Sequence, residues 1–271
     1  MKQFIFHQYP DERGMITLTG SDWRYLSRVR RLRPGDGFTA LLPDGRKVHI
    51  EVREADGRSL LVQCVPPPDS NANANISAKA AAAVPAAAPV LYLFQAMPKG
   101  AKLDLIVRQA AEACVTAIIP FYAARSQGRA VEAGGFRALR LQKIIREARQ
   151  QSGSAVDTVV ESPLDFDGML RRRQDIAANT AGDSAAIFLH ELPLLQTSLH
   201  EALAGNPAAC AIAVGPEGGF TEDEARRFID AGFTPIIVGN SILRTETAAL
   251  YALAAVRTVL LERQIWNLAK K

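Results

Sequence analysis

Two glycine-containing stretches in the C-terminal half carry the residues best suited to hold a small molecule. They are residues 215–221 (GPEGGFT) and 239–248 (GNSILRTETA). Each follows a short apolar run, at 211–214 and 235–238, and each precedes a segment of helical character. Strand, glycine loop and helix in succession place such loops at the carboxyl edge of an α/β sheet, where ligands bind. Because glycine lets the backbone approach a ligand closely, the pattern predicts a cofactor site.

The first stretch also contains the signal of a helix start. Thr221 and Glu224 have the T-x-x-E spacing of a capping box, so we expect a helix to begin at Thr221. The free amides at such a helix end can hold polar ligand groups. A tight strand-to-helix turn without a ligand explains the spacing equally well. The stretch matches neither G-x-G-x-x-G nor a Walker A loop, which disfavours a nucleotide-dependent oxidoreductase or a nucleoside triphosphate site.

Arg244 stands just before the expected last helix, where a cation opposes the helix dipole. Its position therefore requires a local reason. One reason is the binding of an anion, and the other is a structural ion pair with Glu217 or Glu246. His190, at the end of an apolar run, lies on the edge where both glycine loops are expected, although a lone histidine there is more often structural. The sequence offers neither a Ser–His–Asp arrangement nor a pair of catalytic carboxylates.

Basic residues cluster near the N-terminus and after two expected strands. Arg24, Arg28 and Arg31 have i, i+4, i+7 spacing, which predicts a basic face on one helix. Such a face suits a phosphate backbone, and a merely solvated face is the competing interpretation. Lys99 and Arg125 follow the first and second strands of the C-terminal part, and they are further candidates for contact with a phosphate backbone.

The composition bounds the class of protein. The chain has 271 residues, 48% hydrophobic and 22% charged, with a net charge of +4 that allows a polyanionic partner. Its three scattered cysteines predict neither a disulfide framework nor a zinc site, and we expect no metal. The N-terminal apolar run is too short for a signal peptide, and no run reaches membrane-spanning length. These features predict a cytoplasmic protein that does not associate with a membrane.

A low-complexity stretch divides the chain. Residues 70–89 (SNANANISAKAAAAVPAAAP) lack large apolar side chains and predict a linker between residues 1–69 and 90–271. In the first part we expect a helix that is capped by Ser21 or Asp22, followed by three strands in a small, mostly antiparallel barrel. These strands are expected at 38–42, 47–53 and 59–65.

The second part alternates between strands and helices. Its strands are apolar on both faces, which predicts a mainly parallel sheet covered by helices on two sides. The strands are expected at 90–96, 115–121, 158–161, 185–190, 209–214 and 234–238. The helices are expected at 101–113 and 136–151, from 221 onward, and at 245–264.

At the level of motifs, the chain resembles the bacterial 16S ribosomal RNA uridine-N3 methyltransferases of the SPOUT (trefoil-knot) superfamily. The resemblance covers the chain outside the alanine-rich stretch. The stretches GPEGGFTEDE and ILRTETAAL are highly specific to this group, and RVRRLRPGD, Lys99-Gly100, Arg125-Ser126 and Gln151-Ser152-Gly153 support it. It implies a PUA-like β-barrel domain for RNA docking, followed by a knotted α/β domain that binds S-adenosylmethionine and forms a homodimer.

The resemblance also implies a set of site residues. Three loops are expected to hold S-adenosylmethionine. The residues expected to contact RNA are Arg24, Arg28, Arg31, Lys99 and Arg125. Arg244 is the candidate cation for stabilising a deprotonated uridine. The residues expected at the cofactor are Leu189, His190, Glu191, Val214, Gly215, Pro216, Glu217, Gly218, Gly219, Val238, Gly239, Ile242, Leu243, Arg244, Thr245, Glu246, Thr247 and Ala248.

Several positions depart from the family pattern and are expected mostly on the RNA side. They keep two alternatives open: a SPOUT methyltransferase acting on another RNA site, and an RNA-binding ribosome assembly factor with weakened catalysis. The departures include Gln109, Ala111, Ala113, Cys114, Ala124, Gln150, Ser154 and Ser241.

Overall fold

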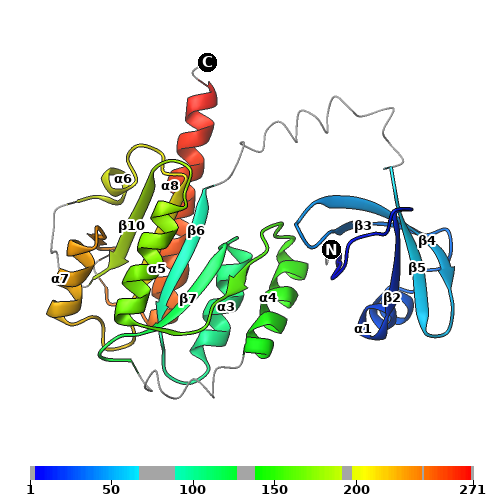
Figure 1. The fold of residues 1–271 in the computed structure, drawn as a ribbon, viewed down its shortest axis with the longest axis horizontal. Helices are drawn as coiled ribbons and strands as arrows, with labels where there is room; N and C mark the ends of the chain where they lie inside the picture. Colours follow the sequence, from blue (N-terminus) through cyan, green and yellow to red (C-terminus); the bar gives the residue numbers. More distant parts are fainter. Residues whose placement is uncertain (1–3, 67–88, 127–137, 191–196, 240, 270–271) are drawn as a thin grey trace. The chain divides into compact units, whose positions relative to one another are not determined.

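The computed structural model describes residues 4–66, 89–126, 138–190, 197–239 and 241–269 (Figure 1). The chain divides into two compact units, one built mainly from residues before 67 and the other from residues 89–148 and from 158 onward. Residues 149–157 group with the first unit. Residues 70–88 of the expected linker lie outside the described part of the chain.

The first unit contains a five-stranded sheet. Its strands are β1 (Phe4–Ile5), β2 (Met15–Thr19), β3 (Gly37–Leu41), β4 (Lys47–Ala55) and β5 (Ser59–Val65). They lie in the order β1-β3-β4-β5-β2, antiparallel except for the parallel pair β1–β3. Ile50 and Val52 on β4, and Leu60 and Val62 on β5, are buried at alternate positions, as on a strand with one face against a core. The three expected strands are confirmed, and β1 and β2 are additional.

The helical segment of the first unit differs from the expectation. α1 (Gly20–Arg24) is followed directly by a π-helical turn, η1 (Tyr25–Val29), so the α-helix is short. Thr19 occupies the N-cap position, and its side chain makes no capping hydrogen bond. The prediction that Ser21 or Asp22 caps this helix is therefore wrong.

The prediction that Arg24, Arg28 and Arg31 share one face of this helix is also wrong. Arg31 lies beyond the helical turns, with a φ of 57°, and the π-turn alters the angular spacing that an α-helix would give Arg24 and Arg28. All three side chains are exposed, and the Arg28 guanidinium lies over the Trp23 ring at 5.4 Å.

The second unit contains a seven-stranded sheet in which every pair is parallel. Its strands are β6 (Val90–Ala96), β7 (Ala117–Tyr122), β8 (Val159–Val160), β9 (Leu164–Asp165), β10 (Ser184–Leu189), β11 (Ala209–Val214) and β12 (Thr234–Ile236). The order is β12-β10-β11-β6-β7-β8, and β9 also pairs with β7. The expected parallel sheet is confirmed, with β6 and β11 matching residue for residue.

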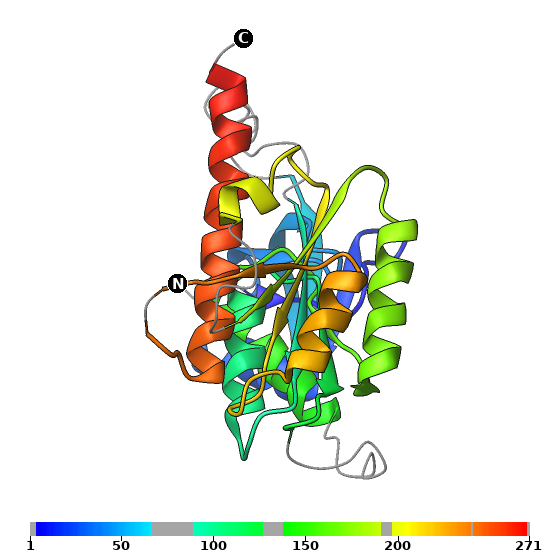
Figure 2. The same cartoon turned by 90° about the vertical axis from the view of Figure 1, so that its left-hand side faces the viewer.

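Helices cover both faces of this sheet (Figure 2). They are α3 (Lys102–Glu112), α4 (Ala138–Ser152), α5 (Phe166–Ala178), α6 (Leu199–Ala202), α7 (Glu222–Asp230) and α8 (Thr245–Ala269). α3, α4 and α8 pack with Leu91 and Leu93 on one face, while α5 and α7 pack with Phe94 and Ala96 on the other. This alternation along β6 explains why the strand reads as one continuous apolar run.

No helix within the described residues is long and apolar enough to cross a membrane. In the same part of the chain, no group of three His, Cys, Asp or Glu side chains is placed to hold a metal ion. Cys64, Cys114 and Cys210 are not joined in disulfides, and burial raises the pKa of Cys210 to about 12.

Candidate functional site

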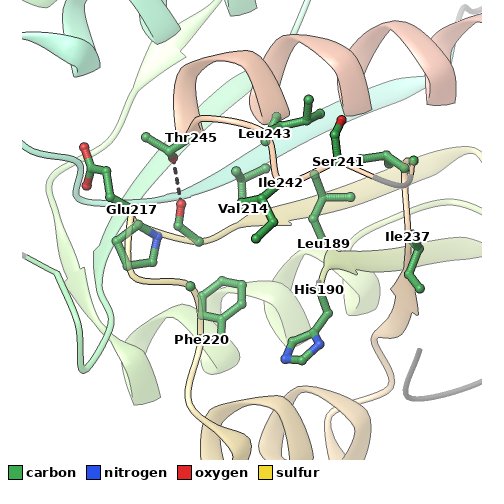
Figure 3. Close-up of a pocket in the computed structure, with 16 residues that line it drawn as sticks. Leu189, His190, Val214, Glu217, Phe220, Ile237, Ser241, Ile242, Leu243 and Thr245 are labelled. Atoms are coloured by element: carbon green, nitrogen blue, oxygen red, sulfur yellow. Dashed lines mark hydrogen bonds between the residues drawn. The ribbon is translucent and has the colours of Figure 1, made fainter. Parts of the chain in front are cut away.

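A cavity of about 390 Å³ lies beyond the carboxyl ends of β10, β11 and β12 (Figure 3). Its lining comes from the end of β10, from the loop between β11 and α7, and from the loop between β12 and α8 with the first turn of α8. The volume falls within the range of pockets that hold small ligands. The edge of the sheet is the one at which open parallel sheets bind their ligands.

The structure brings most of the sequence-predicted cofactor residues together around this cavity. Phe220, Ile237 and Ser241 also line it, although the sequence analysis did not assign them to the cofactor. Ser241, one of the departures from the family pattern, therefore lies at the cavity. The predicted residues in the lining are Leu189, His190, Val214, Gly215, Pro216, Glu217, Gly219, Val238, Gly239, Ile242, Leu243, Thr245 and Ala248.

Five predicted cofactor residues are not among the lining residues. Gly218, Arg244, Glu246 and Thr247 lie outside the lining, and Glu191 lies outside the described residues. The Arg244 side chain is exposed just before α8, and its carbonyl oxygen accepts a hydrogen bond of 2.8 Å from the Ala248 amide.

The loop between β11 and α7 is held in a defined shape. Gly219 has a φ of 67°, in the left-handed region that favours glycine, and its amide donates to the Pro216 carbonyl oxygen at 2.9 Å. The predicted capping box is confirmed, because Thr221 Oγ1 accepts from the Glu224 amide and Glu224 Oε2 accepts from the Thr221 amide. Glu224 Oε1 also accepts a 2.7 Å hydrogen bond from the Ala124 amide, which ties the loop after β7 to the start of α7.

Phe220 anchors the same loop in an aromatic core. Its ring is 6% exposed and lies 4.9 Å from the Phe228 ring, with Phe188 and Phe121 at 6.2 and 6.3 Å. Burial of so large an aromatic group stabilises the fold and fixes the loop that carries it.

Buried polar groups join this loop to the start of α8. Thr245 Oγ1 donates to the Gly215 carbonyl oxygen at 2.7 Å, as the dashed line in Figure 3 marks. Gln95, at the end of β6 and fully buried, donates to the same Thr245 hydroxyl at 3.0 Å. The ends of β6 and β11 and the start of α8 therefore share one hydrogen-bonded network.

Lys102, the first residue of α3, was not among the predicted site residues. Its Nζ lies 2.9 Å from Glu217 Oε1 and 3.2 Å from Glu246 Oε2, so one ammonium group bridges both glycine-loop motifs. The two carboxylates considered as partners of Arg244 are thus both paired with Lys102. A usable signal was present: a lysine in the first turn of a helix opposes the dipole just as Arg244 does.

The charges in this bridge reinforce one another. Hydrogen bonding to Glu217, opposed by desolvation and supported by Glu246, raises the pKa of Lys102. Burial raises the pKa of Glu217, but hydrogen bonds from Lys102 and from the Lys99 amide outweigh it, so that the pKa is lowered overall. The bridge is therefore fully charged at neutral pH.

The predicted RNA-contact residues do not form one cluster within either unit. Arg24, Arg28 and Arg31 belong to the first unit, as described above. Lys99 and Arg125 belong to the second, and both contact the β11–α7 loop: the Lys99 amide donates to Glu217, and Arg125 Nη1 donates to the Gly218 carbonyl oxygen at 2.7 Å. Both of these residues thus help to hold the loop.

Comparison with known proteins identifies the family. The model of the RNA methyltransferase domain matches residues 86–257. The chain belongs to this family. The Ribosomal RNA small subunit methyltransferase E of Mycobacterium bovis is 28% identical over 261 residues, 93% of this chain and 90% of that protein. The protein of the same name from Bacillus subtilis is also 28% identical, over 92% of each chain.

A solved structure shares the fold. The Ribosomal RNA small subunit methyltransferase E of Neisseria gonorrhoeae, bound to S-adenosyl methionine, has a TM-score of 0.71 at 23% identity, covering 96% of this chain and 98% of that one. The family resemblance that the sequence motifs indicated is confirmed by these matches.

Proposed function

We propose that this protein is an S-adenosylmethionine-dependent methyltransferase that methylates N3 of a specific uridine in 16S ribosomal RNA of the small subunit. The observation that carries the proposal is the cavity that the end of β10 and the two glycine loops form at the carboxyl edge of the sheet, in a chain whose relatives over nine-tenths of its length are small-subunit rRNA methyltransferases. The bound S-adenosyl methionine in the structure with the same fold supports this choice of cofactor.

The cavity residues fit such a cofactor. The apolar side chains of Leu189, Val214 and Leu243 offer surfaces for an aromatic base and an aliphatic chain. The Glu217 carboxylate lies in the lining and suits a ligand that carries positive charge on sulfur and nitrogen. Gly215 and Gly239 allow the loops to approach the ligand closely, in the manner expected of glycine-containing cofactor loops.

Bound S-adenosylmethionine supplies an electrophilic methyl group on a sulfonium. The residues of this chain have three tasks: to hold the cofactor, to align uridine N3 with the methyl carbon and sulfur, and to favour loss of the N3 proton. Arg244 is our candidate for the third task, because an exposed cation beside the cavity can stabilise the uridine anion. In the balanced reaction N3 gains the methyl group, sulfur keeps the electron pair of the broken bond, and the N3 proton passes to solvent.

The remaining parts of the proposal rest on the family resemblance. The first unit is a PUA-like barrel that docks RNA, with Arg24, Arg28 and Arg31 among the contacts, joined by Lys99 and Arg125 of the second unit. Residues 70–89 are a linker, and residues 90–271 form the SPOUT domain with its trefoil knot. The protein works in the cytoplasm as a homodimer.

The decisive test is methylation of small ribosomal subunits. Purified protein is incubated with methyl-labelled S-adenosylmethionine and subunits from cells that lack their own copy of the activity, and the labelled nucleoside is identified by mass spectrometry. We expect N3-methyluridine in 16S RNA from the wild type, and a loss of turnover in Arg244→Ala. An Arg244→Ala enzyme with wild-type turnover and cofactor affinity would remove Arg244 from the proposal.

The same assay separates the two alternatives. Label at another nucleotide would identify a methyltransferase with a different RNA target. Cofactor binding without label in any ribosomal RNA would favour an assembly factor with weakened catalysis.

A further inference from the structure

The positive charge of Lys102 lies at an unfavourable position for the helix that carries it. It is the first residue of α3, the end at which the helix dipole is positive and a carboxylate is preferred. A lysine there needs compensation from nearby negative charge. The structure supplies it from two segments distant in sequence, through Glu217 of the β11–α7 loop and Glu246 of the first turn of α8.

The two carboxylates depend on this lysine in turn. Glu217 and Glu246 both lie within 3.2 Å of Lys102 Nζ, and their side chains are only 22% and 14% exposed. Without the ammonium, two partly buried like charges would face each other, and their repulsion would push the two segments apart. Both segments line the cavity, through Glu217 itself and through Thr245 next to Glu246.

We propose that Lys102 is a positioning residue, which holds the β11–α7 loop and the first turn of α8 at the separation that lets the cavity accept its cofactor. Lys102 is not among the residues lining the cavity, so it acts through Glu217 and Glu246. The inference deepens the proposed function and rests on it.

The neighbouring contacts define what Lys102 contributes. The hydrogen bond from Thr245 to the Gly215 carbonyl oxygen already joins the two segments at their buried side. The Lys99 amide holds the Glu217 carboxylate at 3.1 Å from the α3 side. Lys102 is therefore the residue that connects Glu246 to Glu217. Its loss should weaken the contact between the two segments that line the cavity, while the sheet stays folded.

The first experiment compares three variants by calorimetric titration with S-adenosylmethionine. Lys102→Met keeps the length of the side chain and removes the charge, and we expect about tenfold weaker binding. Lys102→Arg keeps a cation within reach of both carboxylates and should restore most of the affinity. Lys143→Met is the matched control, because the ion pair of Lys143 is an exposed i, i+4 pair with Glu147 on α4. It should bind as the wild type does.

Steady-state kinetics separate positioning from a general structural role. In Lys102→Met we expect the KM for S-adenosylmethionine to rise about tenfold while kcat and the KM for small subunits stay within about twofold. A residue that only stabilised the fold would lower the melting temperature of the ligand-free protein and leave cofactor affinity unchanged. Wild-type affinity in Lys102→Met overturns the inference.

A double-mutant cycle tests the path through Glu246. Glu246→Gln removes one of the two facing carboxylates, so the double variant Lys102→Met/Glu246→Gln should bind no more weakly than Lys102→Met alone. Losses that simply add would overturn the coupling. If the wild type itself binds no S-adenosylmethionine, the proposed function has failed. If the wild type binds and the variants match it, the role of Lys102 alone has failed.

Discussion

The two glycine loops around the cavity are built in opposite ways. In the β11–α7 loop, Phe220 is buried in an aromatic core, and hydrogen bonds from Lys99, Arg125 and Thr245 reach the loop from three other segments. In the β12–α8 loop, Ile237 and Ile242 line the same cavity but are 44% and 85% exposed. One loop is held in shape by the fold, whereas the other presents apolar side chains to solvent beside the cavity.

This difference indicates that the two loops contribute to ligand binding in different ways. A loop that is already ordered binds a ligand at a smaller entropic cost, because its side chains lose less conformational freedom on binding. When a ligand covers exposed apolar side chains beside a cavity, removal of their surface from water contributes favourably to the free energy of binding. We therefore expect removal of the buried Phe220 anchor in the first loop to act mainly on folding, and truncation of the exposed apolar side chains in the second to act mainly on cofactor binding.

The largest expected effect is that of Phe220→Ala. Removing a ring packed against Phe228 and Phe188 leaves a cavity in the core, so we expect a loss of about 3–4 kcal/mol in the free energy of unfolding. Urea denaturation measures it. Phe220→Leu keeps most of the volume and should lose less than half as much. A Phe220→Ala protein as stable as the wild type would mean that the fold does not anchor this loop.

Glu224→Ala should have an intermediate effect. Glu224 is 5% exposed, completes the capping box with Thr221 and accepts a hydrogen bond from the Ala124 amide, so its loss leaves two part-buried amides without this acceptor. We expect the free energy of unfolding to fall by about 2 kcal/mol in urea denaturation.

The matched control for this prediction is Glu222→Ala in the same helical turn. The Glu222 side chain is 92% exposed and pairs only loosely with Arg226, at 3.6 Å. Its removal should change stability by no more than about 0.5 kcal/mol. Equal losses in the two variants would show that the contacts of Glu224 are no stronger than a surface charge.

The sequence predicted the start of α7 and two central strands of the sheet better than it predicted helix α5. Strands β6 and β11 were predictable because burial on both faces makes them continuous apolar runs, and Thr221 with Glu224 encodes the helix start locally. Helix α5 was not, because its buried residues Phe166, Met169 and Ile176 are too sparse among charges to give a clear helical period.

Other features depend on contacts that a linear pattern does not contain. The π-turn over Tyr25–Val29 disrupts the expected face of Arg24, Arg28 and Arg31, because that expectation assumed the regular spacing of an α-helix. The bridge at Lys102 joins residues far apart in sequence, so the motif identifies Glu217 and Glu246 but not the lysine that pairs with them.

Ile242→Ala is expected to have the smallest effect on folding and the clearest effect on binding. Because its side chain is 85% exposed, truncation should change the free energy of unfolding by less than about 0.5 kcal/mol. If the cofactor covers this side chain, S-adenosylmethionine should bind about fivefold more weakly, as measured by calorimetric titration. Leu139→Ala removes an 89% exposed leucine from α4, away from the cavity lining, and should alter neither quantity. Unchanged affinity in Ile242→Ala would show that the second loop leaves this residue in water, and the contrast between the loops would then lie in folding alone.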